Sequence, residues 1–211
     1  LHAGVVGSGA GGDEEAGGMM QETTKDKFIN AANSLFYEKG FHATGLDEII
    51  NVVGVTKTTF YKHFESKDDL AIAVLHQRDT MELAEWIGLV TRRGGGDPKA
   101  EILALFDIVE EWLSDPKFAG CMFFKAASEY PSPNDPVHQA AMRHGQNLFR
   151  ELEKRAAMAG AIDAKGLAAQ LMLLLTGAVL ARHETGMPDQ ARSARAAAGV
   201  LVDVQTRREL P

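Results

Sequence analysis

Hydroxyl and cationic side chains crowd into one short segment of this chain, residues 56–63. The segment contains Thr56, Lys57, Thr58, Thr59, Tyr61, Lys62 and His63. Such groups donate hydrogen bonds to phosphate oxygens, and threonine and lysine also reach base edges in a duplex groove. The segment therefore has the chemistry of a nucleic-acid contact. The alternative, which lysines alone would favour, is the solvated face of an ordinary helix.

The residues around this segment predict two short helices joined by a glycine turn. The first helix has a buried stripe with i, i+3, i+4, i+7 spacing, formed by Leu46, Ile49, Ile50 and Val53. Gly54 follows at once, where a helix can end in a left-handed residue, and Thr56 offers a hydroxyl to cap the second helix. Phe60 and Phe64 are the apolar residues of that second helix. This pattern indicates a helix-turn-helix.

The stretch from Val55 to Leu70, VTKTTFYKHFESKDDL, resembles the signature of TetR-type (TetR/AcrR-like) bacterial transcriptional regulators. The upstream residues that fit the first helix of that family and the turn after it are Ala31, Ala32, Leu35, Phe36, Gly40, Phe41 and Thr44. The resemblance covers about residues 25–72 and is specific, because many positions agree in order and spacing. The rest of the chain matches in helical pattern and length.

The resemblance implies that the helix from Thr56 to His63 enters the major groove. It implies phosphate contacts by the Thr44 region, Tyr61, His63 and Lys67, and base contacts by Lys57, Thr58 and Thr59; Lys62 can do either. For Tyr61 the alternative is a ring packed on the small core with its hydroxyl emerging. The resemblance further implies a homodimer on a palindromic double-stranded operator, acting most often as a repressor and released by a small-molecule effector.

Composition limits these interpretations. The net charge is −7, so DNA binding requires a local basic patch, and three lysines stand against one glutamate between Thr56 and Lys67. The negative net charge is also compatible with a scaffold protein whose helix-turn-helix binds another protein. A helical metal enzyme is the other alternative, but the sequence lacks Glu-x-x-His, histidines four apart, Gly-x-Ser-x-Gly and a phosphate-binding loop. We therefore predict no enzyme, no metal site and no cofactor.

Cysteine content and hydropathy favour a cytoplasmic protein. Cys121 is the single cysteine, which excludes an intrachain disulfide. It stands among Met122, Phe123 and Phe124, so we predict a buried structural thiol. The longest apolar run, residues 168–181, falls short of the roughly 20 residues that a bilayer requires. We predict a core or interface helix there and no membrane partner.

We divide the chain into three parts. Residues 1–20 form a leader rich in glycine, which we expect to be disordered. Met19 and Met20 directly precede the first helical pattern, which indicates that the leader comes before the natural start. Residues 21–66 are the predicted helix-turn-helix domain, and residues 67–208 the helical effector-binding and dimerisation domain.

The whole chain is predicted to be all-α, with about nine helices. Three pairs predict helix starts by capping: Thr23 with Asp26, Thr44 with Asp47, and Ser66 with Asp69. A long helix should run over residues 67–91. Helices should then open at Asp97-Pro98, Asp115-Pro116 and Asp135-Pro136, because proline suits a first helical turn. The last two helices are expected over residues 163–185 and 188–208.

Aromatic and methionine residues of the body are candidate lining for an effector pocket. The candidates are Trp86, Phe106, Trp112, Met122, Phe123, Phe124, Met142 and Phe149, with Arg143, Glu129, His144 and Asn147 as polar anchors. Their chemistry favours an apolar or aromatic effector. The alternative for each apolar residue is plain core, and for each polar residue an exposed position.

The last two helices carry more apolar surface than one core requires, which predicts a dimer interface. The candidate residues are Leu167, Leu171, Met172, Leu174, Leu175, Ala178 and Val179 on one helix, and Ala191, Ala194, Ala198, Leu201 and Val202 on the other. Two copies of this pair would form a symmetric four-helix bundle. The alternative is that the stripe is core within one chain.

Overall fold

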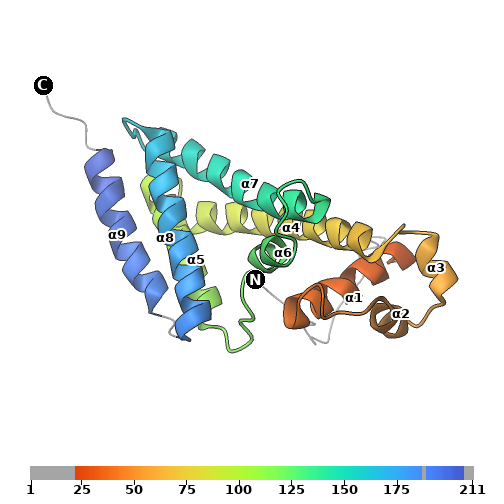
Figure 1. Cartoon of the computed structure of the whole chain (residues 1–211). Coiled ribbons are helices and arrows are strands. Elements are labelled where there is room, and N and C mark those ends of the chain that lie inside the picture. The colour runs from red at the N-terminus through yellow and green to blue at the C-terminus, as the bar shows by residue number, and fades with distance from the viewer. Residues whose placement is uncertain (1–21, 187–188, 207–211) are drawn as a thin grey trace, which may run out of the picture. The chain divides into compact units, whose positions relative to one another are not determined.

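The structure is a computed structural model that describes residues 22–186 and 189–206, so the predicted leader lies outside the described residues. Within the described residues the chain forms nine helices and no strand, which confirms the all-α class (Figure 1). The helices are α1 (Thr24–Lys39), α2 (Leu46–Val53), α3 (Lys57–Tyr61), α4 (Lys67–Gly94), α5 (Pro98–Ser114), α6 (Met122–Glu129), α7 (Pro136–Met158), α8 (Ala164–Thr185) and α9 (Gln190–Gln205). The chain divides into two compact units between Val74 and Leu75, inside α4.

Caps and turns of the first unit mostly follow the sequence. Thr23 and Asp26 form the predicted capping box at the start of α1, and Ser66 accepts a hydrogen bond from the Asp69 N–H at the start of α4. Gly54 ends α2 with a left-handed φ of 75°. Thr44, however, does not cap α2: Gly45 occupies the N-cap position, and the helix start has no side-chain cap.

Aromatic rings fill the core of the first unit. Phe28 lies edge-on to Phe60 at 5.3 Å and to Phe64 at 6.1 Å between ring centroids. Phe36 stacks on Phe41 at 4.5 Å. Because Phe60 belongs to α3, this cluster fixes α3 against α1.

The second unit is built around α5, which packs against α7, α8 and α9, while α8 packs against α7 and α9. The predicted starts at Asp97 and Asp135 are confirmed, since each carboxylate accepts a backbone N–H and proline follows in the first turn. The Asp163 carboxylate likewise accepts a backbone N–H, that of Gly166, at the start of α8. Gly186 ends that helix with a φ of 73°.

Several helix boundaries differ from the prediction, and α3 ends at Tyr61 instead of His63. α4 continues to Gly94 instead of ending near Thr91. Asp115-Pro116 opens a turn rather than a helix: the Phe118 N–H donates to the Asp115 carbonyl, and Gly120 follows with a φ of 94°. That left-handed residue breaks the chain direction, so α6 begins only at Met122.

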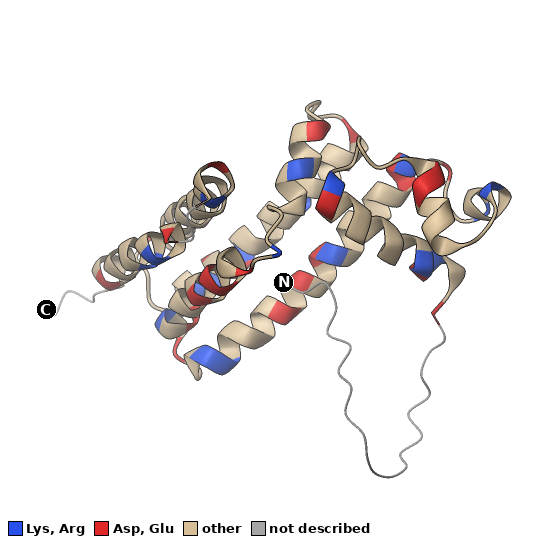
Figure 2. Cartoon of the chain, turned by 90° about the horizontal axis from the view of Figure 1, so that it is seen from below, with Lys and Arg blue, Asp and Glu red and all other residues tan. Residues whose placement is uncertain are grey.

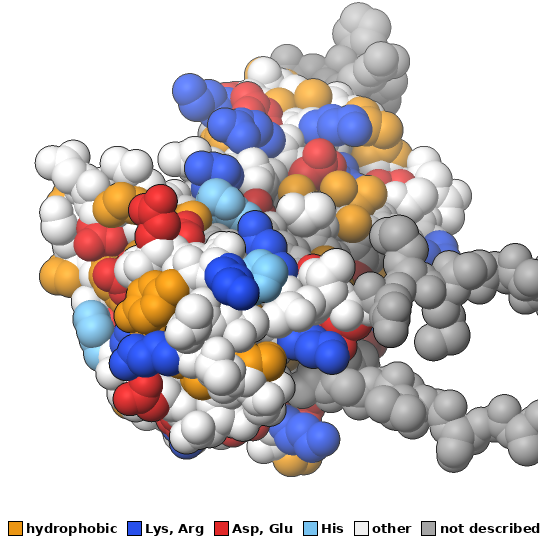
Figure 3. All heavy atoms as spheres, turned by 90° about the vertical axis from the view of Figure 1, so that its right-hand side faces the viewer, with side chains coloured by type: hydrophobic (Ala, Val, Ile, Leu, Met, Phe, Trp, Pro, Cys, Tyr) orange, Lys and Arg blue, Asp and Glu red, His pale blue; other side chains and the backbone are white. Residues whose placement is uncertain are grey.

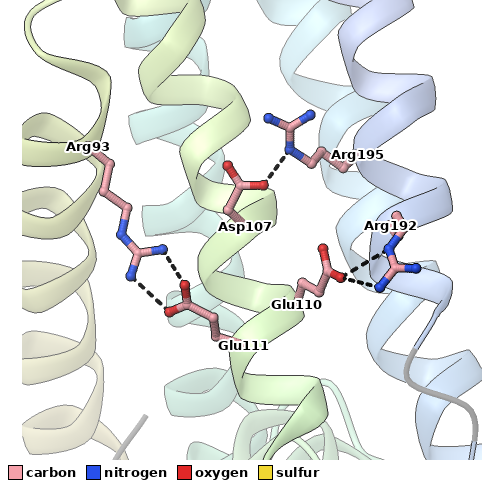
Figure 4. A network of polar contacts seen from close by, with 6 residues as sticks. All are labelled: Arg93, Asp107, Glu110, Glu111, Arg192 and Arg195. Carbon is pink, nitrogen blue, oxygen red and sulfur yellow. Dashed lines mark hydrogen bonds and ion pairs between the residues drawn. The ribbon is translucent and has the colours of Figure 1, made fainter.

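Acidic and basic residues are interspersed along the helices (Figure 2). Ion pairs connect α5 to its neighbours: Arg93 of α4 makes a bidentate contact with Glu111, at 2.7 and 2.8 Å. On the other side, Arg192 and Arg195 of α9 reach Glu110 and Asp107 (Figure 4). These pairs are largely solvated, so each contributes about 0–1 kcal/mol to folding.

The apolar run that looked too short for a bilayer belongs to a longer helix. α8 has 22 residues and a window of mean hydropathy 1.6, so by length and composition it could cross a membrane. Only 33% of that window is buried. The core helix of a water-soluble protein meets the same two criteria.

Cys121 is half-buried as a whole residue, and its structural role remains a prediction. Burial raises its pKa to about 11, which outweighs the lowering effect of hydrogen bonds from the backbone of Phe124 and Phe123. The thiol is therefore protonated at neutral pH, and a protonated thiol is a poor nucleophile.

Candidate nucleic-acid interface

The recognition helix α3 starts at a well-formed cap. The Thr56 hydroxyl accepts the backbone N–H of Thr59 at 3.3 Å and lies 3.0 Å from the Thr59 hydroxyl. Thr56 is thus engaged in capping, and Thr59 is half-buried. Both hydroxyls serve the local fold, so the residues that face outward carry the interface.

Six of the predicted contact residues are exposed: Thr56, Lys57, Thr58, Tyr61, Lys62 and His63. Tyr61 is 54% exposed while its ring lies edge-on to Phe60 at 5.3 Å, so the ring packs on the small core and a phosphate contact by Tyr61 remains a prediction. The face that carries α3 shows basic and histidine side chains among acidic and neutral ones, without a continuous basic area (Figure 3).

Thr44 and Lys67 hold the turn between α1 and α2. The Thr44 side chain is 0% exposed, and its hydroxyl donates to the Gly40 carbonyl at 2.7 Å. The side chain thus serves the turn in this conformation, and a phosphate contact by the Thr44 region remains a prediction. The Lys67 ammonium donates to the carbonyls of Phe41 at 2.8 Å and Thr44 at 3.0 Å. Its phosphate contact remains a prediction.

The sequence analysis treated Asp47 only as a capping partner and did not place it or Glu48, both at the start of α2, near the interface. Asp47 lies 3.2 Å from the Lys57 ammonium, and Glu48 pairs with Lys39. The ten-residue separation of Asp47 and Lys57 gives no periodic signal. Only the folded helix-turn-helix brings the first turns of α2 and α3 together.

The predicted effector residues are dispersed over the body. Phe106, Met122 and Phe123 are buried in its core, Trp112 is half-buried with its ring 5.1 Å from that of Phe118, and Phe124 and Arg143 are exposed. Met142 and Phe149 line an open depression of about 520 Å³ between α7 and α8. Trp86 lines a separate small cavity of about 20 Å³ together with Leu83, Ile87, Val90, Leu105, Leu148, Glu151, Leu152 and Arg155.

A buried polar cluster joins α4 to α7. The Asp79 carboxylate lies 2.9 Å from His144 Nδ1 and accepts a hydrogen bond from Asn147 at 2.7 Å. His144 stacks on Phe123 at 3.8 Å and lies edge-on to Trp86. His144 is therefore buried, so the alternative of an exposed position is wrong for this residue. His144 and Asn147 are three residues apart on one helix face, a spacing that could have revealed the pair.

Replacing Asp79 with alanine is expected to destabilise the body by about 2 kcal/mol or more, because two buried donors lose their partner. Burial raises the pKa of Asp79, but the hydrogen bond and charge of His144, the Asn147 hydrogen bond and the charge of Arg143 together bring it below its ordinary value. A carboxyl whose pKa is lowered by folding stabilises the protein above its unfolded pKa, and this contribution is lost as pH falls through the folded pKa.

Urea unfolding from pH 7 to pH 3 measures this effect. The difference between wild type and Asp79→Ala should be full at pH 7 and shrink below about pH 4. Glu111→Ala is the control, since its carboxylate belongs to an exposed ion pair and its loss should cost under about 1 kcal/mol. Equal effects of the two variants at pH 7 would refute the assignment.

Most of the predicted dimer residues pack within the chain. Leu167, Leu171, Leu175, Ala178, Val179, Ala191, Ala194, Ala198 and Val202 are buried, while Met172, Leu174 and Leu201 are half-buried. The apolar surface that remains outward comes from other positions of the same two helices. We call Leu173 (72% exposed), Leu180, Val200 (64%) and Val204 the outer stripe.

The fold and the α2–α3 unit define a helix-turn-helix DNA-binding protein. Residues 28–74 match the family model "Bacterial regulatory proteins, tetR family", and residues 98–198 match "Tetracyclin repressor-like, C-terminal domain". The chain belongs to the TetR family of transcriptional regulators, whose members are not enzymes.

Individual relatives agree with this assignment. The negative transcriptional regulator IcaR of the icaADBC biofilm operon of Staphylococcus aureus is 46% identical over 131 residues, 62% of this chain and 68% of IcaR. The transcriptional activator FasR of Mycolicibacterium smegmatis is 33% identical over 104 residues. That match spans 48% of this chain and 47% of FasR, so the chain covers about half the length of this relative.

Solved structures show the same fold. SCO4454, a TetR-family regulator from Streptomyces coelicolor, superposes with a TM-score of 0.77 at 27% identity over 87% of this chain and 90% of its own. A regulator from Streptomyces avermitilis, sav143, gives 0.79 at 26% identity over 88% of this chain and 100% of its own.

Proposed function

We propose that this protein is a cytoplasmic, homodimeric repressor that binds a palindromic operator and releases it when a small apolar or aromatic molecule binds the helical body. The observation that carries the proposal is the capped helix α3, which Phe60 fixes to the core. This helix and the two residues after it present Lys57, Thr58, Tyr61, Lys62 and His63 to solvent. In a helix-turn-helix, residues at the start of the second helix contact base edges, and the first helix crosses the backbone.

The dimer is supported by the outer stripe. An exposed apolar surface of this kind on a helix pair calls for a partner. A second copy would cover Leu173 and Leu180 with the equivalent residues of its own, because a two-fold interface pairs one patch with itself. Two reading helices could then occupy half-sites about one DNA turn, 34–36 Å, apart.

Repression is supported by the relatives' names. IcaR, named a negative regulator, shares 46% identity over 131 residues, whereas FasR, named an activator, shares 33% over a shorter segment. A repressor also needs no surface that contacts the transcription machinery, because it can act by binding DNA alone.

The effector site is proposed at the cavity beside Trp86. Seven of its lining residues are leucine, isoleucine, valine or tryptophan, and the Trp86 Nε1–H has no hydrogen-bond partner among the described residues. The cavity measures about 20 Å³, whereas drug-sized ligands occupy about 300 Å³ or more, so binding has to displace lining side chains.

This displacement supplies the release mechanism. Trp86 and Asp79 both belong to α4, the helix whose N-terminal end lies in the first unit. An effector that enlarges the cavity would favour a body with altered α4 packing, and DNA would favour the original packing. Only such a difference in affinity for two conformations can couple the two ligands.

Salt-dependent DNA binding tests the proposal. Fluorescence anisotropy with an operator chosen from the DNA flanking the gene should show log affinity falling linearly with log salt. Lys62→Ala should weaken binding to all sequences alike and make the slope shallower by about one for each phosphate that Lys62 neutralises. Lys154→Ala, an exposed lysine on α7, is the control and should leave the slope unchanged. Binding without salt dependence would favour the protein-binding scaffold instead.

The effector is tested by reciprocity. A compound found by thermal shift should weaken DNA affinity by the same factor by which DNA weakens affinity for the compound. Leu148→Trp, which fills the cavity, should abolish both effects while preserving DNA binding. A compound that still releases DNA from Leu148→Trp would place the effector site elsewhere.

A further inference from the structure

We propose that Asp47 and Lys57 together read one G·C base pair in each half-site, with the carboxylate accepting from cytosine and the ammonium donating to guanine. The inference rests on the DNA-binding function proposed above. It adds a specificity-determining residue, Asp47, to the interface.

The geometry of the pair carries the argument. The Asp47 carboxylate and the Lys57 ammonium lie 3.2 Å apart, with side chains 78% and 57% exposed. Lys57 is the first residue of α3, the position from which a recognition helix reaches base edges. In this arrangement a base pair approached from the side shared by the two groups can meet the Lys57 ammonium and the Asp47 carboxylate together.

The chemistry of a G·C edge matches this pair. In the major groove, cytosine presents the N4 amino donor and guanine presents the O6 and N7 acceptors. N4 and O6 are hydrogen-bonded to each other, so they stand about 2.9 Å apart. An acceptor and a donor held 3.2 Å apart can thus meet N4 and O6 side by side, and N7 offers the ammonium a second acceptor.

An A·T pair fits less well. The adenine N6 donor lies between two acceptors, adenine N7 and thymine O4. A carboxylate at N6 would face the lone pair of N7, whereas cytosine N4 has only an apolar C5–H on its outer side. The same carboxylate, in the first turn of α2, is repelled by the phosphate backbone, so a donor at the base edge would offset this repulsion on DNA.

Selection from a randomised duplex library with the full chain tests the proposal. Wild type should enrich a palindrome with a G·C pair at one fixed position of each half-site. Asp47→Ala and Lys57→Ala should both lose the preference at that same position and keep the others. Glu48→Ala, the same charge change one residue along, should leave the whole preference unchanged.

Affinities for the enriched duplex then give the size of the effect. Exchanging that G·C for A·T should weaken wild-type binding about ten-fold or more per half-site, and the Asp47→Ala variant should lose most of this discrimination. If Asp47→Ala instead binds all sequences more tightly with an unchanged preference, the carboxylate only repels phosphates and the inference is wrong. If wild type enriches no sequence at all, the DNA-binding proposal fails with it.

Discussion

Replacing Phe60 with alanine is expected to abolish DNA binding while leaving the helical body folded. Phe60 is 0% exposed and forms, with Phe28 and Phe64, the aromatic centre of the first unit. Truncating a buried phenylalanine costs about 3–5 kcal/mol. A unit of this size has little stability to spare, because whole domains are stable by only about 5–15 kcal/mol.

Hydrogen exchange combined with anisotropy measures the result. Amides of α1–α3 should lose protection in Phe60→Ala, whereas those of α5, α7 and α8 should retain it. Tyr61→Ala is the matched control, since it removes the neighbouring aromatic side chain from an exposed position. This control should change stability by less than about 0.5 kcal/mol and still weaken DNA binding. A Phe60→Ala variant with normal protection in α1–α3 would show that the cluster is dispensable.

Local chemistry explains why so much of the first unit could be predicted from the sequence. Each cap, at Thr23, Thr56 and Ser66, accepts a hydrogen bond from a backbone N–H three residues further along the chain. Gly54 adopts its left-handed conformation for local steric reasons. Thr44 had the same sequence signal as the caps, with an acidic residue three positions later. Its hydroxyl instead satisfies the Gly40 carbonyl, a partner that only the folded turn supplies.

Contacts between distant residues were beyond the sequence. Asp79 stands in a polar stretch of α4 and looks like a surface residue, yet α7 surrounds it with His144 and Asn147. The pairing of Asp47 with Lys57 likewise depends on the angle between two helices. Residues 115–120 show that a local signal can also fail. Asp-Pro correctly predicted the starts of α5 and α7, but at Asp115-Pro116 the left-handed Gly120 prevents a helix.

The predicted dimer surface shows what the apolar pattern of a helix cannot decide. α8 carries apolar residues around its whole circumference, so the pattern indicates two sides in need of cover without saying which one is core. Leu167, Leu171 and Leu175 form the inner side, and Leu173 and Leu180 form the outer one. The sequence therefore predicted two helices with more apolar surface than one core requires, whereas the positions left outward emerged only from packing against α5, α7 and α9.

Placing charges on the outer stripe is expected to convert the protein to a monomer and to weaken operator binding by about 100-fold or more. The double variant Leu173→Glu/Val200→Glu would set glutamates of both copies against each other in the proposed four-helix interface. Desolvating like charges there costs far more than the apolar contact contributes. A monomer binds each half-site separately and loses the gain from linking two sites, which reaches about 10²–10⁴.

Light scattering coupled to size exclusion gives the mass, and anisotropy gives the affinity. Met81→Glu is the matched control, because Met81 is an exposed apolar residue of α4, outside α8 and α9. It should remain a dimer with normal affinity, which separates loss of the interface from a general effect of added charge. A dimeric double variant would move the interface away from the outer stripe, and a monomeric wild type with full operator affinity would refute the dimer altogether.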